Sequence, residues 1–330
     1  MKTILDIIER GEQPQYELTR KAYGETLVEE GKKDDRIVVL DADLAESTLS
    51  RFYRDDEATS GRFFDLGIAE QNMTNVAAGL SLQGKIPWIS TYAVFVAGRT
   101  WDQLRNTVCY GNLNVKFGAC HGGISVGKDG PTHQSIEDIA ITRVVPNMTI
   151  VIPADYHETK KAVLAGNRHV GPYFLRMGRE KVPIVTDPED PFELGKANTF
   201  LDGDDCYIVC NGIMIHMALL AAKELRDKDG LSVGVINMHT VKPIDREKLI
   251  ECAKRAGSIV TAEEHSVIGG LGSACAEVLC QEHPVPMRIV GVNDRFGESG
   301  PPEELLERWG LTSKEIAESV REVVKMKNIS

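Results

Sequence analysis

The chain has 330 residues, a formal net charge of −11, and a composition that is 42% hydrophobic and 26% charged. This length suffices for two domains with substantial cores. The 38 basic residues form no stripe and are outnumbered by 49 acidic ones, which argues against nucleic acid and anionic membrane as partners. The seven cysteines include no CxxC pair, so we expect neither a disulfide framework nor a zinc site, and the cytoplasm is the simplest location.

The first half of the chain alternates short apolar runs with amphipathic stretches. The runs typical of buried strands lie at 36–40, 87–90, 115–119 and 149–152. The helical patterns lie at 17–31, 70–82, 97–110 and 155–166. Alternation at this spacing predicts an α/β fold in which helices flank a largely parallel sheet.

A proline-rich, acidic segment at about 181–194 interrupts this pattern. Beyond it the alternation starts again, with runs typical of strands at 206–210, 233–237, 258–261 and 287–291. We therefore predict two α/β domains, each with a largely parallel sheet flanked by helices. The first covers residues 1–185 and the second covers residues 199–330, with a linker at 186–198.

The motif GIAEQNM at 67–73 follows a short apolar stretch and reads as a glycine turn that leads into a helix. Glu70 then stands at or near the start of that helix. It has two interpretations: an acid that complements the helix dipole, or a buried glutamate that shares a proton with a ligand nitrogen. For Glu70 taken alone, the first interpretation is favoured.

A glycine-rich segment at 120–134, CHGGISVGKDGPTHQ, comes directly after a predicted strand. Open parallel sheets bind their ligands at this end of the strands, and a long irregular loop is usually functional when it is ordered. His121, Asp129 and His133 in this loop are therefore candidate site residues. Tyr92 and Phe95 also follow a strand, and they belong either to the core or to a face for a flat heteroaromatic ring.

Three further features are individually weak. Arg20 and Arg179 could bind phosphate, although most arginines only cover a surface. The segment GGLGS at 269–273 reads as a helix start, and it leaves an anion site open as an interpretation.

In their order along the chain, these motifs resemble the carboxyl-terminal half of transketolase, a thiamine-diphosphate enzyme. The landmarks are LDADLAEST at 40–48, GIAEQNM, STYAVF at 90–95, HGGISVGKDGPTHQSIED at 121–138, LRMGRE at 175–180, INMHTVKPID at 236–245 and AEEHSVIGGLGS at 262–273. In that family this half comprises a pyrimidine-binding domain and a carboxyl-terminal domain. One departure is that the stretch 91–105 is a residue longer than in many members, with Gly98 where some carry an aromatic.

The resemblance implies a split enzyme, because this chain lacks the GDG-type motif with which the family's amino-terminal domain binds metal and diphosphate. Its nearest counterpart is Gly203-Asp204-Asp205, which lacks the second glycine. We expect no metal site here. An amino-terminal-half partner subunit is expected to hold Mg²⁺ (or Ca²⁺) and the diphosphate of thiamine diphosphate, in an α₂β₂ assembly.

The resemblance also assigns roles to residues. It makes Glu70 the acid that hydrogen-bonds the aminopyrimidine nitrogen of thiamine diphosphate, and it makes His133 a second catalytic residue. The cofactor contacts that it implies are Asp43, Glu70, Tyr92 and Phe95. The substrate contacts that it implies are Arg20, Ser47, His121, Asp129, His133 and Arg179.

The expected function is that of a transketolase subunit in pentose phosphate metabolism, transferring a two-carbon ketol unit between ketose and aldose phosphates. Two sister enzymes are alternatives: 1-deoxyxylulose-5-phosphate synthase and the β subunit of a 2-oxo acid dehydrogenase. The polar loop at 121–134 favours transketolase, since a sugar phosphate needs such a loop. A non-catalytic relative that only binds a partner is the third alternative, and the joint presence of Glu70, Phe95 and the loop residues speaks against it.

Overall fold

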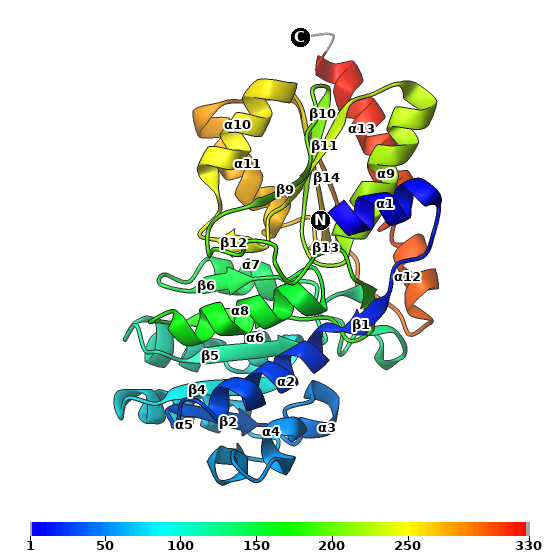
Figure 1. Cartoon of the computed structure of the whole chain (residues 1–330). Coiled ribbons are helices and arrows are strands. Elements are labelled where there is room, and N and C mark those ends of the chain that lie inside the picture. Colours follow the sequence, from blue (N-terminus) through cyan, green and yellow to red (C-terminus); the bar gives the residue numbers. More distant parts are fainter. Residues whose placement is uncertain (1, 328–330) are drawn as a thin grey trace.

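The computed structural model describes residues 2–327, which form two α/β units, one above the other in Figure 1. The sheet of the first unit has seven strands in the order β12-β6-β7-β5-β4-β2-β3. Their bounds are β2 (Ile37–Asp41), β3 (Phe63–Asp65), β4 (Ile86–Tyr92), β5 (Lys116–Cys120), β6 (Thr149–Val151), β7 (Tyr173–Arg176) and β12 (Thr240–Lys242). All neighbouring strands are parallel except β12 and β6.

Helices cover both faces of this sheet. They are α2 (Thr19–Gly31), α3 (Ala45–Thr48), α4 (Arg51–Asp55), α5 (Glu70–Leu82), α6 (Ala93–Arg99), α7 (Asp138–Arg143) and α8 (Tyr156–Arg168), with short 3₁₀ turns η1 (Ser60–Arg62) and η3 (Ile124–Asp129). Side chains alternate along a strand, so Ile37 and Val39 pack with α2 and α8, whereas Val38 and Leu40 pack with α5 and α6.

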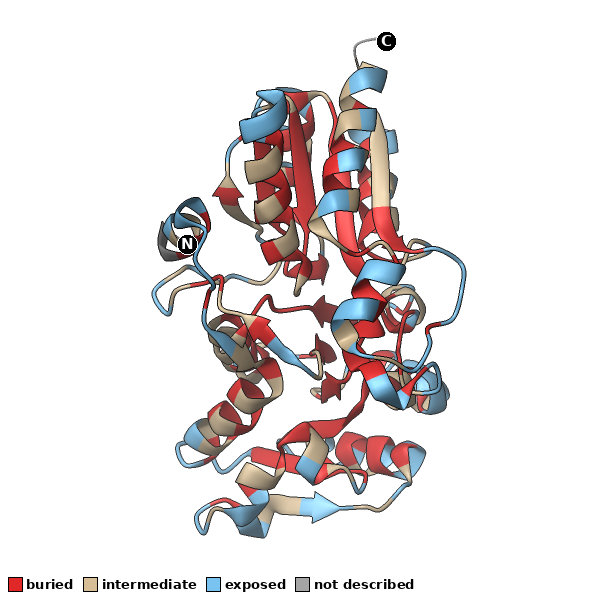
Figure 2. Ribbon diagram, turned by 90° about the vertical axis from the view of Figure 1, so that its right-hand side faces the viewer, coloured by how far each residue is buried: buried red, intermediate tan, exposed pale blue. Residues whose placement is uncertain are grey.

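The second unit has a five-stranded sheet in the order β14-β13-β10-β11-β9. Its strands are β9 (Asn198–Leu201), β10 (Cys206–Cys210), β11 (Val233–Asn237), β13 (Ile259–Ser266) and β14 (Met287–Val292), and only β9 is antiparallel to its neighbour. Its helices are α9 (Met214–Asp229), α10 (Arg246–Ala256), α11 (Leu271–Glu282), α12 (Pro302–Arg308) and α13 (Ser313–Lys327). Figure 2 shows buried residues along the strands of both units and exposed residues on the outer helix faces.

The fold class is as predicted, since both sheets are largely parallel and flanked by helices. The helix predicted over 97–110 is wrong in its bounds. The chain is already helical in α6, turns at Thr100 and continues into a π-helix, η2 (Gln103–Cys109). In η2 the Tyr110 amide donates to the carbonyl of Arg105 at 2.9 Å, five residues earlier. Because each turn of a π-helix holds more residues than an α-helical turn, the predicted single α-helix does not form here.

Two elements each pack with the unit that is formed by the other half of the sequence. Helix α1 (Lys2–Arg10) places Ile4 and Ile8 in the core of the second unit, beside α9 (Figure 1). Strand β12, from the second half of the sequence, forms the edge of the first sheet. In the linker region, β8 (Lys181–Pro183) pairs with β1 (Tyr16–Leu18), and the structure describes all of residues 184–197 without a helix or strand among them.

The two units also share a core. One buried hydrophobic cluster contains Ile150 and Phe174 of the first sheet together with Ile236 and Leu271 of the second unit. Apolar packing therefore continues across the boundary between the units, and it fixes the second unit against the first sheet on the side of β6 and β12.

Candidate active site

A cavity of about 490 Å³ opens at the carboxyl ends of the first unit's central strands. It is lined by Ala42, Asp43, Leu44, Ile68, Glu70, Tyr92, Phe95, Arg99, Asp129 and His133. Six of these ten residues are among those singled out in the sequence. The position agrees with the rule that open α/β sheets bind ligands beyond the carboxyl ends of their strands.

Glu70 is the first residue of α5, and its side chain is only 5% exposed although it borders this cavity. Gly67 adopts a φ of +67° in the turn before the helix, and its amide donates to the Asp65 carboxylate at 2.9 Å. Glu70 Oε1 accepts a hydrogen bond from Arg99 Nη1 at 2.7 Å. This buried acid is therefore paired with a side chain that is itself 47% exposed.

The guanidinium of Arg99 lies over the Phe95 ring. Its carbon atom lies 3.9 Å from the centroid of the Phe95 ring while the same group binds Glu70. Arg99 is not among the site residues predicted from the sequence. The signal that could have identified it is its spacing, because residues four apart on a helix share a face and Arg99 follows Phe95 by four.

The predicted aromatic and histidine residues gather around Tyr92. The His121 ring stacks on Tyr92 with centroids 3.9 Å apart, and the Phe95 and His133 rings lie 5.6 Å and 5.9 Å from Tyr92. His133 also meets Phe95 edge-on at 5.3 Å. Four predicted site residues from two separate segments thus form one contiguous group.

His121 is a neutral imidazole. Burial, together with the positive charges of Arg20 and Arg179, lowers its pKa to about 3. Its Nδ1 is buried without a hydrogen-bond partner, and its φ of +61° is rare for a residue with a side chain. His121 is 2% exposed and does not line the cavity, so it contacts the cavity through the Tyr92 ring on which it stacks.

The loop after β2 is shaped by Asp41. Its carboxylate accepts hydrogen bonds from the Leu44 amide at 2.6 Å and from the hydroxyls of Thr48 and Ser50 at 3.0 Å and 2.8 Å. Burial raises the pKa of Asp41 to about 6. The neighbouring Asp43 has a φ of +61°, its amide donates to Asp65 at 3.1 Å, and its exposed side chain borders the cavity.

The predicted phosphate-binding residues form a second group beside the cavity. Arg20 Nε donates to the carbonyl of Arg179 at 3.1 Å, and Arg20 Nη1 donates to the backbone carbonyl of Ser47. Arg179 Nη1 donates to the carbonyl of Val126 and lies 3.3 Å from Asp129 Oδ1. Arg179 also lines a separate cleft of about 660 Å³ between the two units, and Asp129 connects the two groups.

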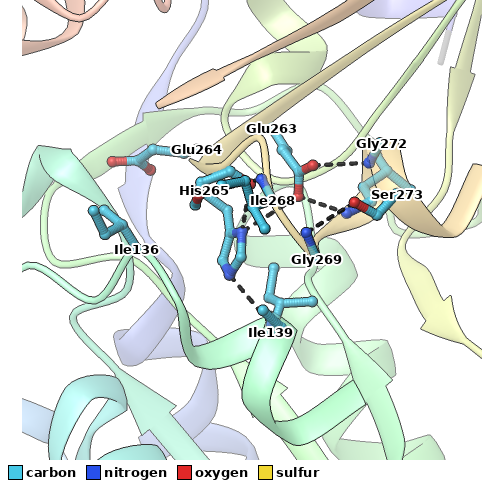
Figure 3. Close-up of polar contacts among 12 residues, drawn as sticks. Ile136, Ile139, Glu263, Glu264, His265, Ile268, Gly269, Gly272 and Ser273 are labelled. Atoms are coloured by element: carbon cyan, nitrogen blue, oxygen red, sulfur yellow. Dashed lines mark hydrogen bonds and ion pairs between the residues drawn. The ribbon is translucent and has the colours of Figure 1, made fainter. Parts of the chain in front are cut away.

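The helix start at 269–273 is present, and its amide groups are already bound. Glu263 accepts hydrogen bonds from the amides of Leu271 and Gly272 at 2.6 Å and 2.8 Å (Figure 3). The chain's own carboxylate therefore occupies the anion position that the sequence left open.

Among residues 2–327, no group of three or more histidine, cysteine, aspartate or glutamate side chains is placed to hold a metal ion. Across the same part of the chain, no helix combines the length and the hydropathy that crossing a membrane requires.

Comparison with known proteins identifies the family. A model of the transketolase pyrimidine-binding domain matches residues 17–185, and a model of the transketolase C-terminal domain matches residues 195–316. The chain is 44% identical over 310 residues to the 6-deoxy-6-sulfo-D-fructose transketolase subunit SqwH of a Clostridium species, covering 94% of this chain and 95% of that protein. It is 38% identical over 308 residues to an apulose-4-phosphate transketolase subunit of Phocaeicola vulgatus, with 93% and 97% covered.

A solved structure described as a split gene transketolase, inactive beta4 tetramer, superposes on this chain with a TM-score of 0.85. The two sequences are 48% identical, and the superposition covers 94% of this chain and 99% of the other. With both domains matched in order over nearly the whole chain, this protein belongs to the transketolase family and corresponds to its carboxyl-terminal half.

Proposed function

We propose that this chain is the subunit of a thiamine-diphosphate-dependent transketolase that supplies the pyrimidine-activating glutamate. The observation that carries the proposal is the pairing of a buried carboxylate, Glu70, with an aromatic face, Phe95, in one cavity at the ends of parallel strands. An aminopyrimidine is a flat ring with nitrogen groups. Its ring can stack on Phe95, and its ring nitrogen can form a hydrogen bond with Glu70.

The fit of these two residues to such a ring is supported by Arg99. A guanidinium is planar and carries N–H donors, and this one lies over Phe95 while it binds Glu70. The two residues thus already accept a planar nitrogen group. When bound, the cofactor supplies the carbanion chemistry that cleaves the bond next to a ketose carbonyl. Glu70 would hold the proton that bonds the ring nitrogen, which requires Arg99 to leave it.

The substrate is proposed to be a sugar with an anionic end. His121, Asp129 and His133 provide polar atoms near Tyr92 for hydroxyl groups, and Arg20 and Arg179 provide positive charge beside them. Binding the distant anion orients the reacting bond. Ketose and aldose phosphates are our first choice, and the relative that is named for a sulfosugar supports testing other anionic sugars.

A partner subunit of the amino-terminal-half type is proposed to hold Mg²⁺ (or Ca²⁺) and the diphosphate, in an α₂β₂ assembly in the cytoplasm. The related split-gene protein described as an inactive beta4 tetramer supports the need for a partner. We propose residues 1–185 and 199–330 as the two domains along the sequence, and the family models at 17–185 and 195–316 support a boundary between them after residue 185. Helix α1 belongs to the first of these by sequence but packs with the second unit.

The test mixes this chain with an amino-terminal-half transketolase subunit, thiamine diphosphate and Mg²⁺, and follows ketol transfer from xylulose 5-phosphate to ribose 5-phosphate. We expect no turnover by either chain alone and turnover on mixing. The Glu70→Gln variant keeps the size of the side chain but cannot give up a proton, so we expect a loss of at least about 100-fold in kcat.

The matched control is Glu57→Gln, an exposed glutamate outside the cavity, which should keep full activity. Turnover by this chain alone would refute the split-subunit proposal. Condensation of pyruvate with glyceraldehyde 3-phosphate in place of ketol transfer would reassign the chain to the 1-deoxyxylulose-5-phosphate synthases. An active Glu70→Gln variant would refute the role of Glu70.

A further inference from the structure

The loop at 121–134 is held in place by the second unit. Glu264 of β13 is 6% exposed, and its Oε1 accepts a hydrogen bond from the amide of Ser125. A Cβ added at Gly123 would collide with the Glu264 carboxylate, so the loop backbone packs directly against this side chain. Ser125 stands four residues after His121 and four before Asp129, so the contact lies at the middle of the predicted site loop.

Adjacent glutamates on β13 point in opposite directions, as side chains on a strand do (Figure 3). Glu263 stays in its own unit and binds the first turn of α11. Glu264 crosses to the first unit. Next along the strand, His265 Nε2 accepts from the Ala140 amide at 3.3 Å, and the Ser266 amide donates to the carbonyl of Ile136 at 2.8 Å. The end of β13 is therefore bonded into the first unit at three successive residues.

The charged groups around Glu264 are also buried. Arg176 Nε pairs with Asp138 at 2.8 Å, and Arg176 Nη2 donates to the carbonyls of Ser135 and Glu264, both at 3.0 Å. Burial raises the pKa of the Glu264 carboxyl, while Arg176 and the Ser125 amide lower it. Arg176 thus binds Ser135, α7 and β13 together. The Glu264 carboxylate lies in this buried region, so a change of its side chain affects the loop that it contacts at Ser125.

A second contact fixes the far end of the same loop. The Gln134 side-chain amide donates to the carbonyl of Ile124 at 3.1 Å and to the carbonyl of Glu298, in the second unit, at 2.9 Å. A side-chain methyl at Gly130 would collide with the hydroxyl of Ser299. Both halves of the loop are therefore packed against the second unit.

We propose that Glu264 is a positioning residue for the candidate active site: by binding the Ser125 amide, it fixes the loop that carries His121, Asp129 and His133. It touches neither cofactor nor substrate. The link to catalysis rests on the proposed function, whereas the link to loop order does not. The carboxyl-terminal domain thereby acquires a defined role, which is to hold a loop of the pyrimidine-binding domain in its working conformation.

The test compares two conservative variants with opposite properties. Glu264→Asp keeps the charge but is one methylene too short to reach the Ser125 amide. Glu264→Gln loses the charge but keeps an oxygen at the same reach. The control is Glu277→Ala, which removes a different carboxylate contact between the units. The Glu277 side chain is 59% exposed and pairs with Arg143 of α7 at 2.6 Å, not with the loop at 121–134.

The first readout is hydrogen–deuterium exchange of the 121–135 segment in the isolated chain, with a thermal unfolding curve for each variant. We expect at least about tenfold faster exchange in Glu264→Asp, with Glu264→Gln and Glu277→Ala close to the wild type. The second readout is ketol transfer with the partner subunit. There Glu264→Asp should lose roughly tenfold or more in kcat/KM, through a raised KM for the sugar phosphate, and Glu264→Gln should retain most of it.

Unchanged loop exchange in Glu264→Asp would overturn the proposal, because the loop would then be ordered without this contact. A larger defect in Glu264→Gln than in Glu264→Asp would also overturn it, because the charge of the side chain and not its reach would then matter. If the wild-type pair of subunits shows no ketol transfer, the proposed function fails, and the exchange data still decide whether Glu264 positions the loop.

Discussion

Glu70 and Glu263 make an instructive pair, because both are buried and both lie at the start of a helix, Glu70 as the first residue of α5 and Glu263 on the strand that precedes α11. Glu263 is sealed: its two oxygens accept the amides of Leu271 and Gly272 at the start of α11. Glu70 borders a cavity, and its bond is to Arg99, a side chain that is 47% exposed. A buried glutamate at a helix start is thus a structural acid in one unit and a candidate reactive acid in the other.

The difference lies in what the acid's partners can do. Backbone amides of a helix cannot move away without unfolding the helix, so Glu263 contributes to stability. A half-exposed arginine can rotate into solvent at small cost, since ion pairs of this exposure contribute roughly 0–1 kcal/mol. Glu70 can therefore exchange its partner for a ligand while the fold remains intact.

The largest effect should come from the sealed acid. Replacing Glu263 with Ala leaves two buried amides without an acceptor, so we expect the free energy of unfolding to fall by about 4 kcal/mol. Glu70→Ala should lower it by about 1 kcal/mol or less. Urea unfolding of both variants measures the difference. Equal losses would show that the contrast between the two acids is wrong.

A pH titration tests whether Asp41, at the end of β2, is a buried acid like Glu263. Burial raises the pKa of Asp41 to about 6 in the folded chain, against about 3.9 in the unfolded chain. The folded state therefore holds this proton more tightly. The contribution of Asp41 to stability is fully present below about pH 4 and is lost as the pH rises through about 6.

The Asp41→Asn variant lacks this titration. Relative to the wild type, its free energy of unfolding should improve by about 3 kcal/mol between about pH 4 and pH 7. Chemical unfolding at several pH values measures this change. Parallel stability curves for the two proteins would contradict the assignment of a buried, titrating acid to the end of β2.

The smallest effect concerns the partner of the open acid. If Arg99 competes with the cofactor for Glu70 and Phe95, Arg99→Ala should bind thiamine diphosphate up to roughly fivefold more tightly, equivalent to about 1 kcal/mol. Calorimetric titration of the assembled subunits measures it. Arg105→Ala, an exposed arginine that lies over Trp101, is the control. Weaker binding in Arg99→Ala would mean that Arg99 itself holds a ligand.

Much of the fold could be predicted, because buried parallel strands are marked by apolar runs. The runs at 206–210 and 233–237 coincide with β10 and β11. Strand β12 could not be predicted in this way: it is three residues long, and its partner β6 lies about ninety residues earlier in the sequence. Helix α1 is not among the predicted helices, and nothing in its local sequence indicates that Ile4 and Ile8 pack beside α9.

The candidate site was predictable in its residue types but not in its pairings. Glu70, Phe95, Asp129 and His133 do line one cavity. The Arg99–Glu70 contact depends on side-chain conformations, which no spacing rule fixes. For Ser47, the contact with Arg20 uses the backbone carbonyl, and a backbone group carries no signal in the side-chain sequence. The support that Glu264 gives to Ser125 joins residues 139 positions apart, beyond the reach of any local pattern.

The exchange of edge elements between the two units has a consequence for how the gene can be divided. Cutting the chain in the segment between β8 and β9 would leave α1 on the amino-terminal fragment and β12 on the carboxyl-terminal fragment. Each would then be separated from the surface that it covers. The amino-terminal fragment would then carry an uncovered β6 edge, which invites pairing with other chains. Evolution or engineering that separates these halves must therefore supply a new edge strand, even though the linker itself looks like a natural place to cut.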